Sequence, residues 1–257
     1  MGNRNRASGW KYAKISGHKN ESIIESLMNS DEKYQKAFLN KIGNPNSVIK
    51  HIETGGIYEK DVECIFEGKK TKSKTDMKVF LDDGSTYNIS IKKSLGGQVY
   101  LISDSRFIEG FEKQYNIEIP SDVKRGIQLF WGSASDTKDL IDKYGTKKNY
   151  EYRKNRLVAD TIKKYDSNLY TILLNWFAEN TYLIADFCFS KGLACNKYDW
   201  ADFIWYKNEL GENKIDDIFS IHDLCSALQE IAMSTTSYGT RNRRNNNSDG
   251  IWICSMA

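Results

Sequence analysis

Apolar and polar residues alternate along residues 75–93, TDMKVFLDDGSTYNISIKK, in the pattern of two short strands joined by a tight turn. The segment 81–84, Leu-Asp-Asp-Gly, fits a three-residue hairpin loop that is closed by a glycine with positive φ. Such a loop pairs Lys78 with Asn88. A two-residue loop would mix apolar and polar side chains on both faces, which a half-buried sheet resists. The predicted apolar face consists of Met77, Val79, Leu81, Tyr87, Ile89 and Ile91, and the polar face carries Asp76, Lys78, Asn88, Ser90 and Lys92.

The polar face of this hairpin carries candidate chemistry. The register places Asp76 opposite Ser90, with Lys92 one diagonal step away. A carboxylate suits magnesium, a hard cation that prefers oxygen ligands and water, and the backbone carbonyl of Ile91 could add a further oxygen. A lysine beside the metal can orient or deprotonate an attacking water and offset charge on a phosphate. The hairpin therefore predicts metal-dependent phosphodiester hydrolysis, and the alternative is an amphipathic hairpin whose polar face meets water.

A second carboxylate is predicted on a helix near the N-terminus. Ser16 and Gly17 have the character of a helix start, and an apolar stripe at helical spacing follows. That stripe consists of Ile23, Ile24, Leu27 and Met28. Glu21 lies about 90° around the helix from the centre of the stripe, where a carboxylate can lean over the sheet. The alternative is a first-turn glutamate that is favoured only by the helix dipole.

The remaining pattern predicts an α/β fold, with α+β as the alternative. Strands are expected at 61–68 and 99–103, and at 181–189 and 200–208 in a second sheet region. Helices are expected within 106–115, 122–132, 169–180 and 221–233, and in parts of 138–165. We expect an N-terminal arm and a catalytic core in residues 1–150, and a helix-and-strand region with a recognition loop in 151–257. One continuous domain is the alternative.

Composition and charge narrow the class of protein. The 257 residues are 40% hydrophobic and 28% charged, which is typical of a globular chain. No run of about 18 apolar residues and no secretory signal occur, so we expect no membrane span and a cytoplasmic location. The five cysteines are odd in number and form no CxxC pair, which favours reduced, buried thiols over disulfides or a zinc site.

Basic residues are concentrated near the two ends, although the net charge is only +3. The first 20 residues contain five Lys or Arg and no acid, and a second cluster follows Tyr238. Basic segments that flank a balanced domain point to nucleic acid as a partner. Arginine reads guanine and asparagine reads adenine in the major groove, whereas phosphate neutralisation is the equally favoured alternative. The second cluster consists of Arg241, Asn242, Arg243, Arg244 and Asn245.

The order Glu21, Asp76, then Ser90-Ile91-Lys92 resembles the active site of the PD-(D/E)xK nuclease superfamily. In particular, the chain is similar to type II restriction endonucleases that cut short palindromic sites. The similarity extends to AKISGHKNE at 13–21, to TILLNWFAENTYLIADFCFSKG at 171–192, and to the Gly/Arg/Asn-rich stretch 238–250.

This resemblance implies a core with a central mixed β-sheet flanked by helices, and a C-terminal DNA-recognition region. It also implies Mg²⁺-dependent cleavage of double-stranded DNA to 5′-phosphate and 3′-hydroxyl ends, with a cognate DNA methyltransferase as genetic partner. Asp76 matches the first acid, Lys92 the lysine and Glu21 the helix glutamate. Asp76, Glu21 and the Ile91 carbonyl would hold the metal.

Ser90 departs from the motif, because it stands where the superfamily usually has Asp or Glu, and we expect Glu21 to compensate. The departure keeps open a non-cleaving DNA-binding protein of the same fold. A repair or structure-specific nuclease is a third interpretation. A palindromic target would favour a homodimer. The expected DNA contacts are Lys14, His18, Lys93, Ser94, Tyr238, Arg241, Asn242, Arg243, Arg244 and Asn245.

Overall fold

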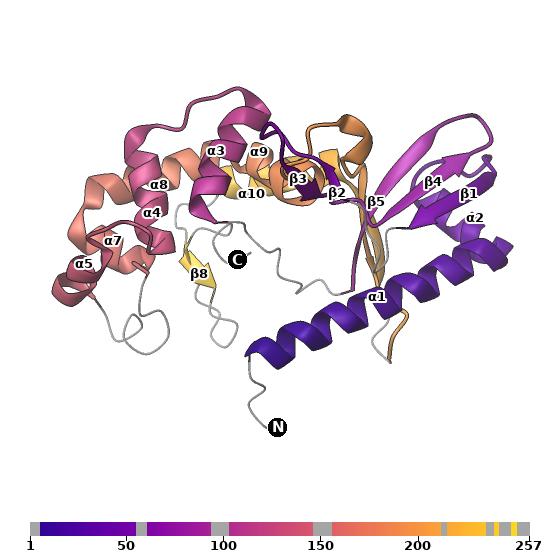
Figure 1. Cartoon of the computed structure of the whole chain (residues 1–257), viewed down its shortest axis with the longest axis horizontal. Helices are drawn as coiled ribbons and strands as arrows, with labels where there is room; N and C mark the ends of the chain where they lie inside the picture. Colours follow the sequence, from indigo (N-terminus) through magenta and orange to yellow (C-terminus); the bar gives the residue numbers. More distant parts are fainter. Residues whose placement is uncertain are drawn as a thin grey trace. The chain divides into compact units, whose positions relative to one another are not determined.

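The computed structural model describes residues 6–54, 61–93, 103–145, 156–211, 215–234, 239–241 and 248–250, with side chains described between residues 15 and 232 (Figure 1). The chain forms two compact units, each built from two segments. Residues 1–97 and 189–224 form what we call the sheet unit, and residues 98–188 and 225–257 form the helical unit. The predicted assignment of catalysis to 1–150 and recognition to 151–257 concerns function and stays a prediction.

The sheet unit contains a five-stranded mixed sheet, which confirms the α/β expectation. The strand order is β1-β4-β5-β6-β7, and β5 and β6 run parallel while the other neighbours are antiparallel. The prediction that residues 200–208 belong to a second sheet was wrong, because their strand pairs directly with the hairpin. The strands are β1 (Ile49–Thr54), β4 (Met77–Leu81), β5 (Thr86–Lys92), β6 (Phe203–Lys207) and β7 (Asp216–Ser220).

The predicted hairpin register is confirmed. Lys78 pairs with Asn88 across β4 and β5. At the turn, the Leu81 N–H donates to the Ser85 carbonyl at 3.0 Å, and Gly84 has a φ of +87°. A side chain at that φ would be strained, so the glycine fixes the loop length and with it the faces of both strands.

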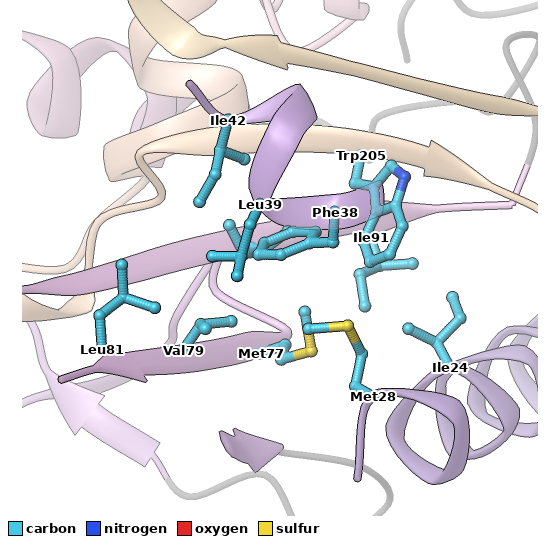
Figure 2. Packing of buried hydrophobic residues seen from close by; sticks show 11 residues of the cluster. Ile24, Met28, Phe38, Leu39, Ile42, Met77, Val79, Leu81, Ile91 and Trp205 are labelled. Carbon is cyan, nitrogen blue, oxygen red and sulfur yellow. The ribbon is translucent and has the colours of Figure 1, made fainter. Parts of the chain in front are cut away.

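The apolar face of the sheet is covered by two helices, α1 (Arg6–Ser30) and α2 (Glu32–Lys41). Figure 2 shows Ile24 and Met28 of α1 and Phe38 of α2 among the sheet side chains. The predicted start of α1 at Ser16 was wrong. The helix begins at Arg6, because the preceding segment contains good helix formers and no proline. The buried cluster consists of Ile24, Met28, Phe38, Leu39, Ile42, Met77, Val79, Leu81, Ile89, Ile91 and Trp205.

Two further strand predictions differ from the structure. The strand expected at 61–68 is only β2 (Asp61–Glu63), and it pairs with β3 (Lys70–Lys72) in a separate small sheet. Residues 181–189, expected as a strand, form α9 (Thr181–Asp186) and enter a π-helix, η2 (Phe187–Lys191). A short, mostly apolar run fits a buried strand and a buried helix equally well, and here packing selects the helix.

The helical unit confirms the predicted helices. Aromatic side chains fill its interior: Phe111 contacts Trp176 edge-on and Phe187 lies against Phe107. Its helices are α3 (Asp104–Tyr115), α4 (Ser121–Trp131), α5 (Thr137–Tyr144), α7 (Ala159–Tyr165), α8 (Ser167–Glu179) and α9, with most of α10 (Ile221–Ser234). Of the C-terminal tail, β8 (Gly239–Arg241) and β9 (Ser248–Gly250) are described. The strand expected at 99–103 lies almost wholly outside the described residues.

The cysteines agree only in part with the predicted buried thiols. The four cysteines of the described ranges are all free thiols. Cys64, Cys188 and Cys225 are buried as expected, whereas Cys195 is exposed, so the prediction of a buried thiol was wrong there. Within the described residues, no helix is both long enough and apolar enough to cross a membrane.

Candidate active site

Three elements of the sheet unit bring the predicted site residues together. Asp76 immediately precedes β4, Ser90 and Lys92 lie on β5, and Glu21 lies on α1. The Asp76 N–H donates at 2.9 Å to the carbonyl of Ile89, the residue that already pairs with Met77. The paired register ends at Met77 and Ile89, so the direct opposition of Asp76 and Ser90 stays a prediction, although their side chains are hydrogen-bonded to each other.

The Asp76 carboxylate is the centre of a hydrogen-bonded cluster. Its Oδ2 atom accepts the Ile91 N–H at 2.6 Å, the Ser90 hydroxyl at 3.3 Å and the Lys92 ammonium at 3.2 Å. One bond comes from the backbone of the neighbouring strand, so the position of the carboxylate is fixed by the sheet itself. The side chain remains about a quarter exposed, and it is therefore held in place but still accessible to a ligand.

Lys92 completes the cluster. Besides Asp76, its Nζ atom donates to the Ser90 hydroxyl at 2.7 Å and to the Ile91 carbonyl at 3.1 Å. An ammonium has three donors, so these three acceptors use all of them. The positively charged Lys92 ammonium therefore lies directly beside the Asp76 and Ile91 oxygens that were predicted to bind metal.

Glu21 approaches the same cluster from α1. Its side chain is 19% exposed, and burial raises the pKa of its carboxyl, with the negative charge of Asp76 raising it further. The His18 ring, 3.2 Å away through Nδ1, and the charge of Lys92 act in the opposite direction on this pKa. Because α1 begins at Arg6, the interpretation of Glu21 as a first-turn residue was wrong.

The polar face of the hairpin does not simply meet water, and that alternative was wrong. Ser90 is 1% exposed and Asn88 is 6% exposed. The Asn88 amide donates to the carbonyls of Tyr198 and Trp200, while its own backbone N–H donates to Asp202 at 2.8 Å. A loop of the sheet unit therefore covers the central part of this face and leaves the Asp76 end accessible.

The predicted DNA-contacting residues are described only in part. His18 is bonded to Glu21, and Lys93 Nζ donates to the Ser16 hydroxyl at 2.9 Å, so both lie at the junction of α1 and β5. Of Lys14 and Arg241, only the backbone is described. The others lie outside the described residues: Ser94, Tyr238, Asn242, Arg243, Arg244 and Asn245.

The donor atoms at this site suit a hard cation. Two carboxylates, Glu21 and Asp76, lie near enough for the charge of one to raise the pKa of the other, and the Ile91 carbonyl adjoins them. Within the described residues, no group of three or more His, Cys, Asp or Glu side chains forms a metal cage. Magnesium commonly uses one or two carboxylates and keeps several waters, so this oxygen set fits it.

One buried residue beside the site was missed by the sequence-based prediction. Asn20 is 1% exposed and lies four residues before Ile24, on the same face of α1. A polar residue that continues an apolar stripe is the signal that could have identified it.

Comparisons with known proteins give similarity to solved structures alone. No family model matches the chain, and no curated protein matches it. Among solved structures, the chain is similar to the crystal structure of the restriction endonuclease MspI in complex with its cognate DNA. The TM-score is 0.49 and the sequence identity is 12%, over 87% of this chain and 80% of that chain. At this level of similarity, nothing about activity or ligands follows for the present chain.

Proposed function

We propose that the chain is a type II restriction endonuclease. It hydrolyses phosphodiester bonds of double-stranded DNA at a specific sequence, with Mg²⁺, and leaves 5′-phosphate and 3′-hydroxyl ends. The observation that carries the proposal is the meeting of Glu21, Asp76 and Lys92 from three separate elements. These residues follow one another in the order of the superfamily motif that the sequence resembles.

Asp76 and Glu21 are the proposed metal-holding carboxylates, with the Ile91 carbonyl as a neutral third oxygen. Bound Mg²⁺ would polarise the scissile phosphate and lower the pKa of a coordinated water. The backbone N–H of Ile91 holds the Asp76 carboxylate in place, and the packing of α1 on the sheet brings Glu21 to it. Carboxylates that repel one another, and that burial keeps from water, gain most from a shared cation.

Lys92 has the role of water or phosphate orientation. Its ammonium now donates to Asp76, Ser90 and the Ile91 carbonyl. A cation on the Asp76 and Ile91 oxygens would compete with these bonds, which would free donors of Lys92 for the attacking water or the phosphate. Lys92 would thus offset part of the carboxylate charge without the metal and contact the water or the phosphate when the metal is bound.

Ser90 has a supporting role in this proposal. Its hydroxyl accepts from Lys92 at 2.7 Å and donates to Asp76 at 3.3 Å, so it links the lysine to the aspartate. A hydroxyl is a poor Mg²⁺ ligand, and the second carboxylate must then come from Glu21.

Partners and location follow from the same proposal. The arginine-rich tail around Arg241 would contact double-stranded DNA, a cognate methyltransferase would protect the host DNA, and the enzyme would act in the cytoplasm. A palindromic recognition site would favour a two-fold homodimer.

A second candidate is a DNA-binding protein of the same fold that does not cut. The observation in its favour is that Ser90 leaves the β5 position without a carboxylate, while Lys92 engages Asp76. A nuclease for damaged or branched DNA is a third candidate and differs in substrate only.

Incubation of purified protein with phage and plasmid DNA in Mg²⁺ separates these candidates. Discrete fragments with 5′-phosphate ends support the proposed function. DNA that is shifted in a gel but stays intact supports the second candidate. Cleavage confined to damaged or branched substrates supports the third.

A further inference from the structure

Asn20, next to Glu21 on α1, makes two directed hydrogen bonds inside the sheet unit. Its Nδ2 donates to the Lys207 carbonyl at 2.8 Å, and its Oδ1 accepts the Glu209 N–H at 2.7 Å. The side chain is 1% exposed, so both bonds are shielded from water. An unpaired amide at this depth would carry a large desolvation cost, and the two bonds remove it.

These bonds connect α1 to the strand beside the site. The Asn20 carboxamide bonds to the Lys207 carbonyl and to the Glu209 N–H. A residue of a neighbouring parallel strand would use its backbone to bond to the same two groups. Lys207 is the last residue of β6, and β6 runs parallel to β5 with Tyr206 paired to Lys92. The anchor of α1 therefore belongs to the strand next to the one that carries Lys92.

The anchor point is itself held by a charge network around the buried Lys207 side chain. Lys207 is 8% exposed, and its ammonium contacts Glu209 at 3.0 Å and Asp216 at 2.8 Å. The Tyr34 hydroxyl of α2 donates to Glu209 at 3.0 Å, and the Tyr34 ring lies 4.8 Å from the Lys207 ammonium. The segment that receives Asn20 is thus held by contacts from two other elements, β7 through Asp216 and α2 through Tyr34.

Apolar packing alone would not place Glu21 accurately. Contacts of Ile24 and Met28 with the sheet are non-directional and permit a helix to roll or slide slightly. A roll of about 20° would move a carboxylate at the helix surface by about 2 Å. Functional groups must be held within about 0.5 Å and 10–20°. Two hydrogen bonds on the adjacent residue supply that restraint.

We propose that Asn20 is a positioning residue, which sets the rotation and height of α1 so that Glu21 meets Asp76 over the sheet. The inference rests on the proposed function, because it assigns Asn20 to the second metal-holding carboxylate. Asn20 acts through Glu21 and does not itself touch metal or DNA.

The test compares Asn20→Leu and Asn20→Ala with Met28→Ala. Leucine is close in size and makes no hydrogen bond. Alanine leaves room for water to satisfy Lys207 and Glu209, which protects the fold if the leucine variant is unstable. Met28→Ala is the matched control, since it weakens the packing of α1 on the sheet but leaves the Asn20 bonds intact.

Two readouts are needed, the Mg²⁺ concentration for half-maximal cleavage and the Mg²⁺ affinity measured by calorimetry without turnover. We expect both Asn20 variants to bind Mg²⁺ about tenfold or more weakly than wild type. Their kcat at saturating Mg²⁺ should return to the wild-type value. Met28→Ala, at a similar loss of unfolding free energy, should leave the Mg²⁺ affinity nearly unchanged. Equal Mg²⁺ affinity in wild type and Asn20 variants, or an equal shift in Met28→Ala, overturns the inference.

The calorimetric readout separates this inference from the proposed function. A wild-type protein that binds Mg²⁺ through Asp76 and Glu21 but cuts no DNA overturns the proposed function, and the Asn20 variants still decide the positioning role. A wild-type protein that binds no Mg²⁺ overturns both.

Discussion

At the scale of single residues, the pKa of Glu21 connects folding to the site. Burial and the charge of Asp76 raise this pKa, so the folded chain binds the Glu21 proton more tightly than the unfolded chain does. The stability from this group is fully present below the ordinary carboxyl pKa of about 4.3, and it is lost as pH rises through the raised folded value. At neutral pH, without metal, the ionised Glu21 therefore costs stability.

Replacement of Glu21 by Gln tests that cost. We expect Glu21→Gln to have a higher unfolding free energy than wild type at pH 8 without divalent ions. The advantage should shrink as pH falls toward about 4, because wild-type Glu21 is then protonated. Urea unfolding at the two pH values gives the comparison. An advantage that does not change with pH would mean that the charge of Glu21 is not the cause.

Ser90→Asp tests the missing acid of the motif. Ser90 is 1% exposed, and a carboxylate there would lie beside Asp76 as well as Lys92. We expect the variant to lose about 1–3 kcal/mol of stability without metal and to recover it in Mg²⁺. Thermal unfolding with and without Mg²⁺ measures this. A loss that Mg²⁺ does not reverse would place the oxygens of this cluster outside a metal site.

Part of the site could be predicted at this scale and part could not. Asp76, Ser90 and Lys92 follow from the hairpin register, which turn chemistry and face alternation determine locally. The role of Asn20 could not be predicted, because the hydrogen-bond partners of its amide are backbone groups of Lys207 and Glu209, which lie far away in the sequence.

At the scale of elements, local signals determine the hairpin but not every helix. The turn requires a residue with positive φ at one position, and Gly84 supplies it. That position fixes the register between the two strands. The helix start at Ser16 was a weaker signal, since the residues before it also favour helix and α1 begins at Arg6. The run 181–189 was ambiguous, because a short and mostly apolar stretch has too few polar positions to reveal a period.

Gly17→Ala tests the extent of α1. A Cβ at this position would lie 3.8 Å from the Glu21 Oε1 atom, an ordinary contact. In a helix interior the substitution should raise the unfolding free energy by about 1 kcal/mol. Urea unfolding measures the change. An unchanged or lower stability would argue that the helix does not continue through this residue.

At the scale of the whole molecule, the pairing of β5 with β6 was beyond sequence reasoning. Residues 86–92 and 203–207 form the parallel pair of the sheet, although more than a hundred residues separate them. Each strand has a recognisable local pattern, but a local pattern does not predict which other strand will pair with it. The sequence therefore predicted the fold class and the hairpin, and not the order of the strands.

DNA recognition by the tail is a prediction at this same scale. We expect at least one of Arg241, Arg243 and Arg244 to read a base. Its replacement by Ala should then cost about 1–3 kcal/mol on the cognate duplex and little on a scrambled duplex. Salt-dependent binding of the three single variants to both duplexes measures this. Uniform losses on both duplexes, with the salt slope reduced by about one in each variant, would make the tail a phosphate clamp.

The central claim is that Asp76 and Lys92 perform metal-dependent DNA cleavage, and the most direct test is single-turnover cleavage by Asp76→Asn and Lys92→Ala. Lys78→Ala is the matched control, because Lys78 is also a partly exposed lysine of this hairpin face but contacts Tyr198 and Asp199 instead. We predict that wild type and Lys78→Ala cut DNA in Mg²⁺, whereas both site variants bind DNA but cut at least about 10²-fold more slowly. Cleavage by either site variant at the wild-type rate would contradict the claim.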